Sequence, residues 1–116
     1  MCARTQGGFT TIELMVAMSV VGVLAAIAFP RFTGYKSNAF DSRAEVTLRH
    51  VATAEEAYFS ENEIFVACDQ TTCSILLPGL GPLSRGVILN ISLTPEGFQG
   101  TATHPQGSGT VYTWNH

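Results

Sequence analysis

The residue whose chemistry is hardest to explain is Glu13, because it stands at the beginning of an apolar stretch. Residues 14–29 contain no charged side chain, and the pair Gly7-Gly8 lies just before Glu13. A lone carboxylate at bilayer depth costs roughly 2.5–3.5 kcal/mol or more, so such residues usually have a partner. We therefore expect Glu13 to be matched by a positive group.

The cysteines at positions 2, 68 and 73 are the next candidates for chemistry. Cys68 and Cys73 enclose the run CDQTTC, a spacing that suits a short disulfide loop in an oxidising compartment. Two reduced thiols are the alternative. Removal of the first eight residues would take Cys2 away and leave an even pair. Zinc is disfavoured because His104 and His116 show no paired ligand spacing, so we predict no metal and no cofactor.

No arrangement in the sequence predicts catalysis. His104 and Ser108 lie close together in the chain, but nothing orients them, and the stretch HPQGSG is typical of a hairpin turn. Glu55 lies within an apolar helical face, where we expect a backbone or hydroxyl partner. The net charge is −3 and no cluster of Lys or Arg is present, which argues against nucleic acid as the main partner. We predict that the chain is not an enzyme.

Residues 1–30 must position Glu13, and their pattern allows several interpretations. A conventional secretory signal peptide would use Arg4 as its basic start and would be cleaved after Ala28, in the sequence Ala-Ile-Ala. Glu13 would then stand at the entrance of the apolar region, which argues against it. A plain membrane anchor is the second interpretation, because residues 9–29 are close to the ~20 needed to span the hydrocarbon.

The third interpretation rests on the run GFTTIEL at residues 8–14, followed by an apolar stretch that ends in Ala-Phe-Pro at residues 28–30. This pattern resembles the class III signal of type IV pilins and their relatives. The resemblance implies cleavage by a prepilin peptidase between Gly8 and Phe9, with N-methylation of Phe9. It also implies three segments: a leader of residues 1–8, a transmembrane and filament-core helix of residues 9–30, and a globular head of residues 31–116.

Cleavage would create an amine at Phe9, four residues before Glu13. In a bundle of parallel helices, Glu13 of one subunit would meet the Phe9 amine of its neighbour, and pairing in a low dielectric would favour one stagger between subunits. The resemblance implies this assembly role for Glu13. It also suggests that the helix between Gly22 and Pro30 partly unwinds in assembled pili, whereas a simple kink at Pro30 is the alternative for the subunit alone.

The remaining chain predicts a helix and a small sheet. Apolar residues at helical spacing continue to about Asn62, so residues 31–62 form an amphipathic helix. Residues 65–86 are predicted to be a disulfide-containing loop with a helical turn, and residues 87–116 an antiparallel meander. Its three strands are expected at 87–94, 98–104 and 110–114. The fold class is α+β, a long N-terminal helix whose hydrophobic half protrudes and whose amphipathic half packs on a three-stranded sheet; this is also the pilin fold.

The resemblance implies a structural subunit of a type IV pilus. It would be held in the bacterial inner membrane and polymerised with copies of itself into an extracellular filament for adhesion or twitching motility. Its partners would be the lipid bilayer, the prepilin peptidase and the inner-membrane assembly machinery. A minor pilin or a type II secretion pseudopilin is the alternative, although residues 105–116 lack the carboxylates that a pseudopilin calcium site would need. From another class, a small secreted binding domain remains open.

Overall fold

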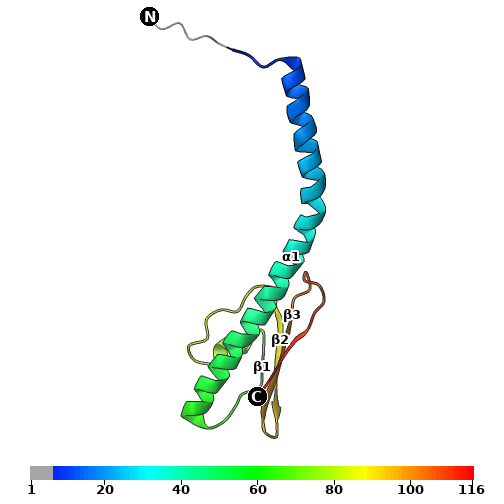
Figure 1. Cartoon of the computed structure of the whole chain (residues 1–116). Helices are drawn as coiled ribbons and strands as arrows, with labels where there is room; N and C mark the ends of the chain where they lie inside the picture. Colours follow the sequence, from blue (N-terminus) through cyan, green and yellow to red (C-terminus); the bar gives the residue numbers. More distant parts are fainter. Residues whose placement is uncertain (1–6) are drawn as a thin grey trace, which may run out of the picture. The chain divides into compact units, whose positions relative to one another are not determined.

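The computed structural model describes residues 7–116 and contains a long helix, a short helix and four strands (Figure 1). Residues 1–6 of the predicted leader, Cys2 and Arg4 among them, lie outside the described residues. The described residues fall into two compact units, an N-terminal unit that ends at Gly34 and a head, Tyr35–His116. The elements are α1 (Thr11–Asn62), β1 (Cys68–Asp69), α2 (Cys73–Leu76), β2 (Ile88–Thr94), β3 (Gly97–Thr103) and β4 (Tyr112–Asn115).

The N-terminal unit contains the first part of α1, and its side chains contact little else within the unit. Ala25 is half-buried and every other described residue of the unit is exposed. α1 is long and apolar enough to cross a membrane. Its apolar side chains therefore need cover from a bilayer or from other helices. The large ones, each more than half exposed, are Ile12, Leu14, Met15, Val16, Met18, Val20, Val21, Val23, Leu24, Ile27, Phe29 and Phe32.

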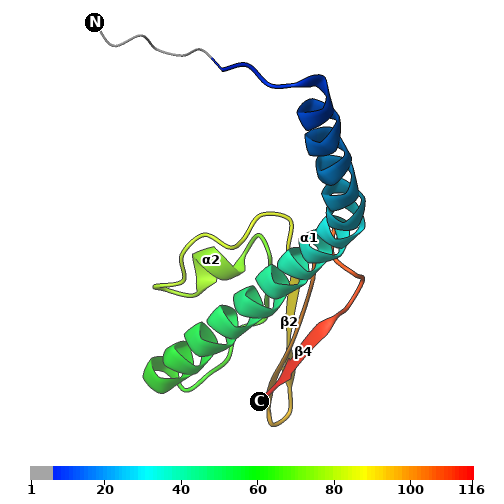
Figure 2. The same ribbon diagram turned by 45° about the horizontal axis from the view of Figure 1, so that its top comes forward.

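The head half of α1 lies across the sheet, as Figures 1 and 2 both show. One face of this helix is buried, and it contains residues at helical spacing: Ala44, Leu48, Val51, Ala52 and Glu55. This face confirms the predicted amphipathic helix, which ends at Asn62 as expected. Phe59, which the sequence places on the same face, remains 41% exposed and stacks on Phe65 beyond the end of the helix.

The sheet has four antiparallel strands in the order β1-β2-β3-β4, so the predicted three-stranded sheet was one strand short. The additional strand is β1, in which Cys68 pairs with Ile91 and Asp69 with Asn90. Two residues are too few to show the alternation of apolar and polar side chains that predicts a strand. The predicted α+β class and long N-terminal helix are confirmed.

The core of the head lies between α1 and the sheet. Leu89, Ile91, Phe98 and Ala102 contribute apolar side chains from β2 and β3, and all are almost completely buried. Gly100 of β3 allows the closest approach, because a Cβ placed there would lie 2.8 Å from the Cδ1 atoms of both Leu48 and Ile91. The contact between helix and sheet therefore depends on a missing side chain at this position.

Candidate processing and assembly site

The Gly8–Phe9 peptide bond lies in an exposed segment outside regular secondary structure. Gly7–Thr10 are not helical, α1 begins at Thr11, and the Phe9 side chain is 92% exposed. Exposed chain outside secondary structure is the usual site of proteolytic cleavage. A peptidase could therefore reach the predicted bond without first unwinding α1.

Glu13 and Thr10 form a capping box at the start of α1. The Glu13 carboxylate Oε2 accepts hydrogen bonds from the Thr10 backbone N–H at 2.8 Å and from the Thr10 hydroxyl at 2.9 Å. In return, the Thr10 Oγ1 accepts a bond from the Glu13 N–H at 3.3 Å. Threonine at the N-cap and glutamate three residues later satisfy backbone donors that a helix otherwise leaves free.

This arrangement adds a residue that the sequence analysis missed. Thr10 could have been found from the pattern T-x-x-E directly before an apolar run, which is the signature of a capping box. Phe9 precedes the helix, so its backbone is free to change direction after cleavage. The pairing of Glu13 with a neighbour's Phe9 amine stays a prediction, since it concerns a second, cleaved copy.

Gly22 and Pro30 both lie within a continuous helix. A Cβ at Gly22 would meet no atom within 4 Å, so no contact in this chain requires glycine there. Pro30 has no N–H to donate, yet α1 continues through it, and the Thr33 hydroxyl donates to the Pro30 carbonyl at 3.0 Å. The predicted partial unwinding between the two residues in a filament stays a prediction.

Cys68 and Cys73 form a disulfide that joins β1 to the first residue of α2, as expected from their spacing. Asp69 organises the turn between them by accepting hydrogen bonds from the Thr71 hydroxyl, the Thr71 N–H and the Thr72 N–H. These bonds lower the pKa of Asp69 to about 2, with those from Thr71 the largest cause. The loop is therefore held by both a covalent bond and a local network.

Glu55 lies beneath this loop and is completely buried. Its Oε2 accepts a hydrogen bond from the Val66 backbone N–H at 3.0 Å, which confirms the expected backbone partner. Its Oε1 lies 3.9 Å from the Cys68 sulfur, a van der Waals contact because a disulfide sulfur carries no proton. Burial raises the pKa of Glu55, and the bond from Val66 opposes this shift. Glu55 thus ties the segment just before β1 to α1.

Asp41 holds the connection between β3 and β4 on α1. Its carboxylate Oδ1 accepts a hydrogen bond from the Ser108 N–H at 3.0 Å. His104 Nδ1 accepts from the Gln106 N–H at 3.1 Å, and the His104 ring stacks on Phe40 at 4.4 Å. His104 and Ser108 therefore serve the structure of the predicted turn, and Asp41 is a partner that sequence spacing could not reveal.

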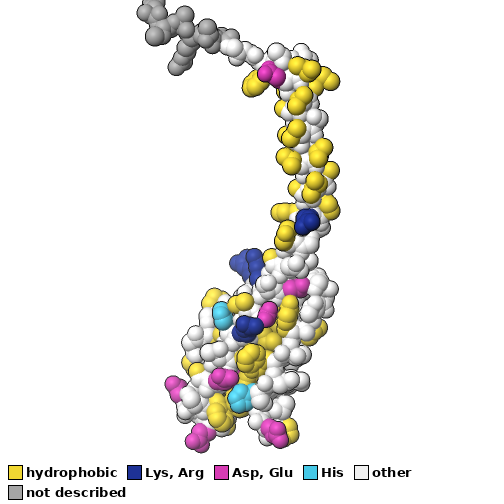
Figure 3. Space-filling view, in the orientation of Figure 1, with side chains coloured by type: hydrophobic (Ala, Val, Ile, Leu, Met, Phe, Trp, Pro, Cys, Tyr) yellow, Lys and Arg dark blue, Asp and Glu magenta, His cyan; other side chains and the backbone are white. Residues whose placement is uncertain are grey.

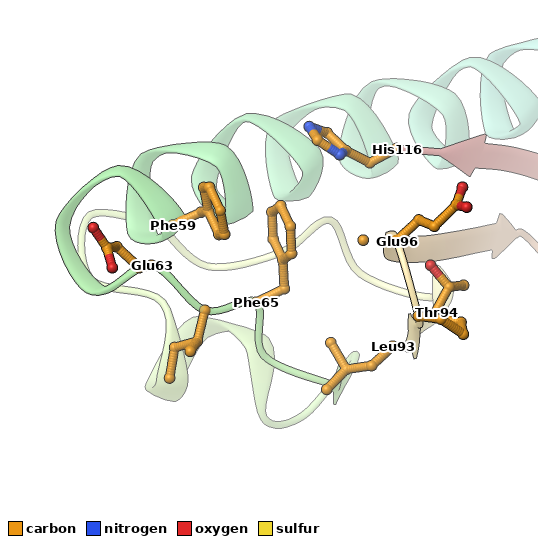
Figure 4. Close-up of a pocket in the computed structure, with 10 residues that line it drawn as sticks. Phe59, Glu63, Phe65, Leu93, Thr94, Glu96 and His116 are labelled. Carbon is orange, nitrogen blue, oxygen red and sulfur yellow. The ribbon is translucent and has the colours of Figure 1, made fainter.

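The far end of the head contains a pocket of about 390 Å³ that no sequence pattern predicted (Figure 4). Its aromatic lining comes from three places in the chain: Phe59 near the end of α1, Phe65 in the following loop, and His116 after β4. Phe65 stacks on Phe59 at 4.4 Å and lies 5.1 Å from the His116 ring. Glu63 and Glu96 also line the pocket, so carboxylates stand beside aromatic rings.

The N-terminal segment is similar to segments of known proteins. Residues 3–29 match the family described as the prokaryotic N-terminal methylation motif. The type IV major pilin protein PilA of Myxococcus xanthus is 41% identical over 56 residues, which cover 48% of this chain and 26% of that protein. The type IV major alpha-pilin of Moraxella bovis is 36% identical over 71 residues, 61% of this chain and 45% of that pilin.

One relative is similar over almost the whole chain. The type II secretion system core protein G of Vibrio cholerae is 26% identical over 113 residues, which cover 93% of this chain and 77% of that protein. By contrast, the matches to the two pilins span less than half of the pilins' own length. The chain therefore carries the type IV prepilin methylation motif and is a relative of type IV pilins and, at lower identity, of a type II secretion core protein.

Proposed function

We propose that this chain is the structural subunit of a type IV pilus. In this proposal a prepilin peptidase cuts after Gly8, Phe9 is N-methylated, and the processed subunit waits in the inner membrane. Assembly machinery there polymerises it into an extracellular filament. The observation that supports the proposal is the match of residues 3–29 to the methylation motif, together with a Gly8–Phe9 bond that is exposed, non-helical and followed by a helix with an uncovered apolar surface.

The uncovered surface explains how one subunit serves two environments. In the bilayer, lipid tails cover the apolar side chains of α1. In a filament, the same side chains of neighbouring copies cover one another by van der Waals packing. Glu13 favours one stagger between neighbouring subunits, because its carboxylate needs a positively charged partner within the filament. The Thr10 bonds hold it at the helix start until the Phe9 amine of a neighbour becomes available.

A mass spectrum of the mature chain tests processing. We expect a chain that starts at N-methyl-Phe9, whereas a start at Phe29 or an uncut chain would contradict the proposal. Glu13→Leu tests assembly, since this variant should be processed and inserted but give no filaments in a sheared surface fraction. Glu45→Leu is a matched control that removes a carboxylate in the head. Normal filament yield from Glu13→Leu would refute the pairing role.

A second candidate is a subunit of a type II secretion system. It is favoured by the match to core protein G of Vibrio cholerae, which covers 93% of this chain and so extends through the head. A deletion strain separates the two functions. Loss of surface filaments with normal protein secretion supports the pilus, and loss of secretion without loss of filaments supports the secretion system.

A further inference from the structure

Most charges of the head are divided between its two ends. An exception is Asp41, a carboxylate that lies between Lys36 and Arg43 in the sequence and accepts a hydrogen bond from the Ser108 N–H. Lys36 and Arg43 lie in the first turns of the head half of α1, and Arg43 is placed over the Phe40 ring at 5.4 Å. Arg85 belongs to the same end, because a Cβ on the adjacent Gly86 would touch the His104 ring, which stacks on Phe40. We call Lys36, Arg43 and Arg85 the cationic end.

The opposite end of the head carries only carboxylates. Glu56, Glu61 and Glu63 follow one another at the end of α1, and Glu96 lies in the turn between β2 and β3. Residues 50–84 and 86–116 contain no Lys or Arg. On the face shown in Figure 3, several acidic side chains and no basic ones lie on the lower end of the head. We call these four glutamates the acidic end, about 38 Å from Lys36 along the helix.

Neither end is neutralised by an ion pair within the described part of the chain. Among the residues that the structure describes, Arg49 and Glu45 form the only ion pair, and both lie between the two ends. The exposed carboxylates of the acidic end therefore repel one another, and so do the cations of the other end. A second copy whose cationic end lay against this acidic end would relieve the repulsion at both ends.

The pocket at the acidic end is suited to a cationic side chain. Phe59, Phe65 and His116 offer aromatic rings, and Glu63 and Glu96 stand at the pocket's edge (Figure 4). A guanidinium or ammonium group gains from an aromatic face and from a nearby carboxylate. The same pocket would not favour an anion, because both of its charged side chains are negative.

The backbone of Glu63 closes the end of α1. Glu63 has φ +58°, in the left-handed region that follows many helices and that glycine adopts without a steric cost. Its N–H donates to the Phe59 carbonyl at 2.7 Å, so it closes the helix as glycine would.

We propose that the acidic end of one head binds the cationic end of a second copy of this chain. The two surfaces differ, so the contact is heterologous and repeats into an open filament instead of closing a dimer. Its partner is therefore a copy of this chain with the same orientation. This inference rests on the proposed filament, and it adds the head contact that would set the orientation of successive heads.

Chemical cross-linking of assembled filaments tests the contact directly, because Lys36 is the one lysine of the sequence. A carbodiimide joins an amine to a carboxylate only where the two already touch. We expect a dimer band whose cross-linked peptides join Lys36 to Glu56, Glu61, Glu63 or Glu96 of another copy. Lys36→Arg keeps the charge and should keep the filaments but abolish this band. Lys36 joined only to carboxylates outside the acidic end, or filaments with no Lys36 cross-link, would overturn the inference; a cross-link between Phe9 and Glu13 would report the helix pairing instead.

Charge variants of the full chain give an independent test. Glu63→Gly with Glu96→Gln should lower the yield of sheared filaments by about tenfold or more, since rim charges of an interface are lost. Glycine suits the Glu63 backbone, so misfolding would not explain the loss. Asn90→Lys with Ser92→Lys changes the net charge by the same two units at exposed positions of β2 and should assemble normally. Equal yields from both pairs would refute the inference, whereas absence of filaments from the unaltered chain would instead refute the proposed function.

Discussion

At the scale of single residues, Thr10 and Glu13 explain how a charged side chain can begin an apolar helix. The carboxylate has two donors from Thr10, and the first turn of α1 gains an acceptor for a backbone N–H that would otherwise lack one. The same carboxylate is the group expected to pair with a neighbouring amine during assembly. Thr10 therefore supplies a partner for Glu13 in the single subunit.

Replacement of Thr10 by valine tests this local role. Thr10→Val keeps the shape but removes the hydroxyl, so the first turn of α1 should lose about 1 kcal/mol. Hydrogen exchange in detergent micelles should then show about fivefold faster exchange of the first-turn amides. Thr10→Ser retains the hydroxyl and should exchange like the natural chain. Identical exchange in the valine variant would show that the capping box contributes nothing.

Glu55 makes the stability of the head depend on pH. Its pKa in the folded chain is raised above the ordinary value of 4.5, so the folded state binds a proton more tightly than the unfolded state. The contribution of Glu55 to stability is therefore fully present below pH 4.5 and is lost as the pH rises through the raised pKa. Urea unfolding in detergent, followed by the fluorescence of Trp114, should show this decline as the pH is raised above 4.5.

Glu55→Gln separates charge from hydrogen bonding. Its amide oxygen can still accept from the Val66 N–H, and it has no proton to gain, so the decline with pH should disappear. Glu55→Ala should instead cost about 2 kcal/mol, because a buried N–H loses its acceptor. Equal pH dependence in the glutamine variant and the natural chain would assign the effect to another group.

At the scale of elements, the packing of α1 on the sheet depends on Gly100. Gly100→Ala would place a methyl group against Leu48 and Ile91, and the crowding should cost about 1–2 kcal/mol. Urea unfolding measures the loss. Gly81→Ala is the control, because a Cβ at Gly81 would meet nothing within 4 Å. A Gly100 variant as stable as the control would mean that the helix can move away from the sheet without cost.

The elements also show what sequence patterns can predict here. The long helix and its end at Asn62 followed from apolar spacing, and β2 followed from clean alternation of side chains. β1 did not, because its two residues are held by pairing with β2 and by the disulfide. Thr10 could have been predicted from a known local motif, the capping box. Asp41 was not, because its partner Ser108 lies 67 residues away.

The pocket at the acidic end was equally hidden from sequence. Phe59 and Phe65 are six residues apart, but the ring of His116 reaches them only through the pairing of β3 with β4. The turn between β2 and β3 places Glu96 at the same pocket. Local patterns therefore located the processing segment, while the surface between heads required the fold.

At the scale of the whole molecule, this chain carries two surfaces that a single copy leaves unsatisfied. The apolar side chains of the N-terminal unit are exposed, and the two charged ends of the head have no ion-pair partners among the described residues. Apolar packing supplies most of the favourable free energy in such an assembly but little direction. Complementary charges at opposite ends supply the direction.

Co-assembly of two reversed variants tests whether the heads join end to end. Glu56→Lys, Glu61→Lys, Glu63→Lys and Glu96→Lys together make the acidic end positive, while Lys36→Glu, Arg43→Glu and Arg85→Glu make the cationic end negative. Each variant alone should fail to form filaments, because like charges then meet at every contact. Produced together, each altered end meets an oppositely charged end of the other variant. Sheared filaments should therefore contain both variants in about equal amounts, as an alternating heterologous contact requires. Either variant assembling alone, or no filaments from the mixture, would show that the heads meet through other surfaces.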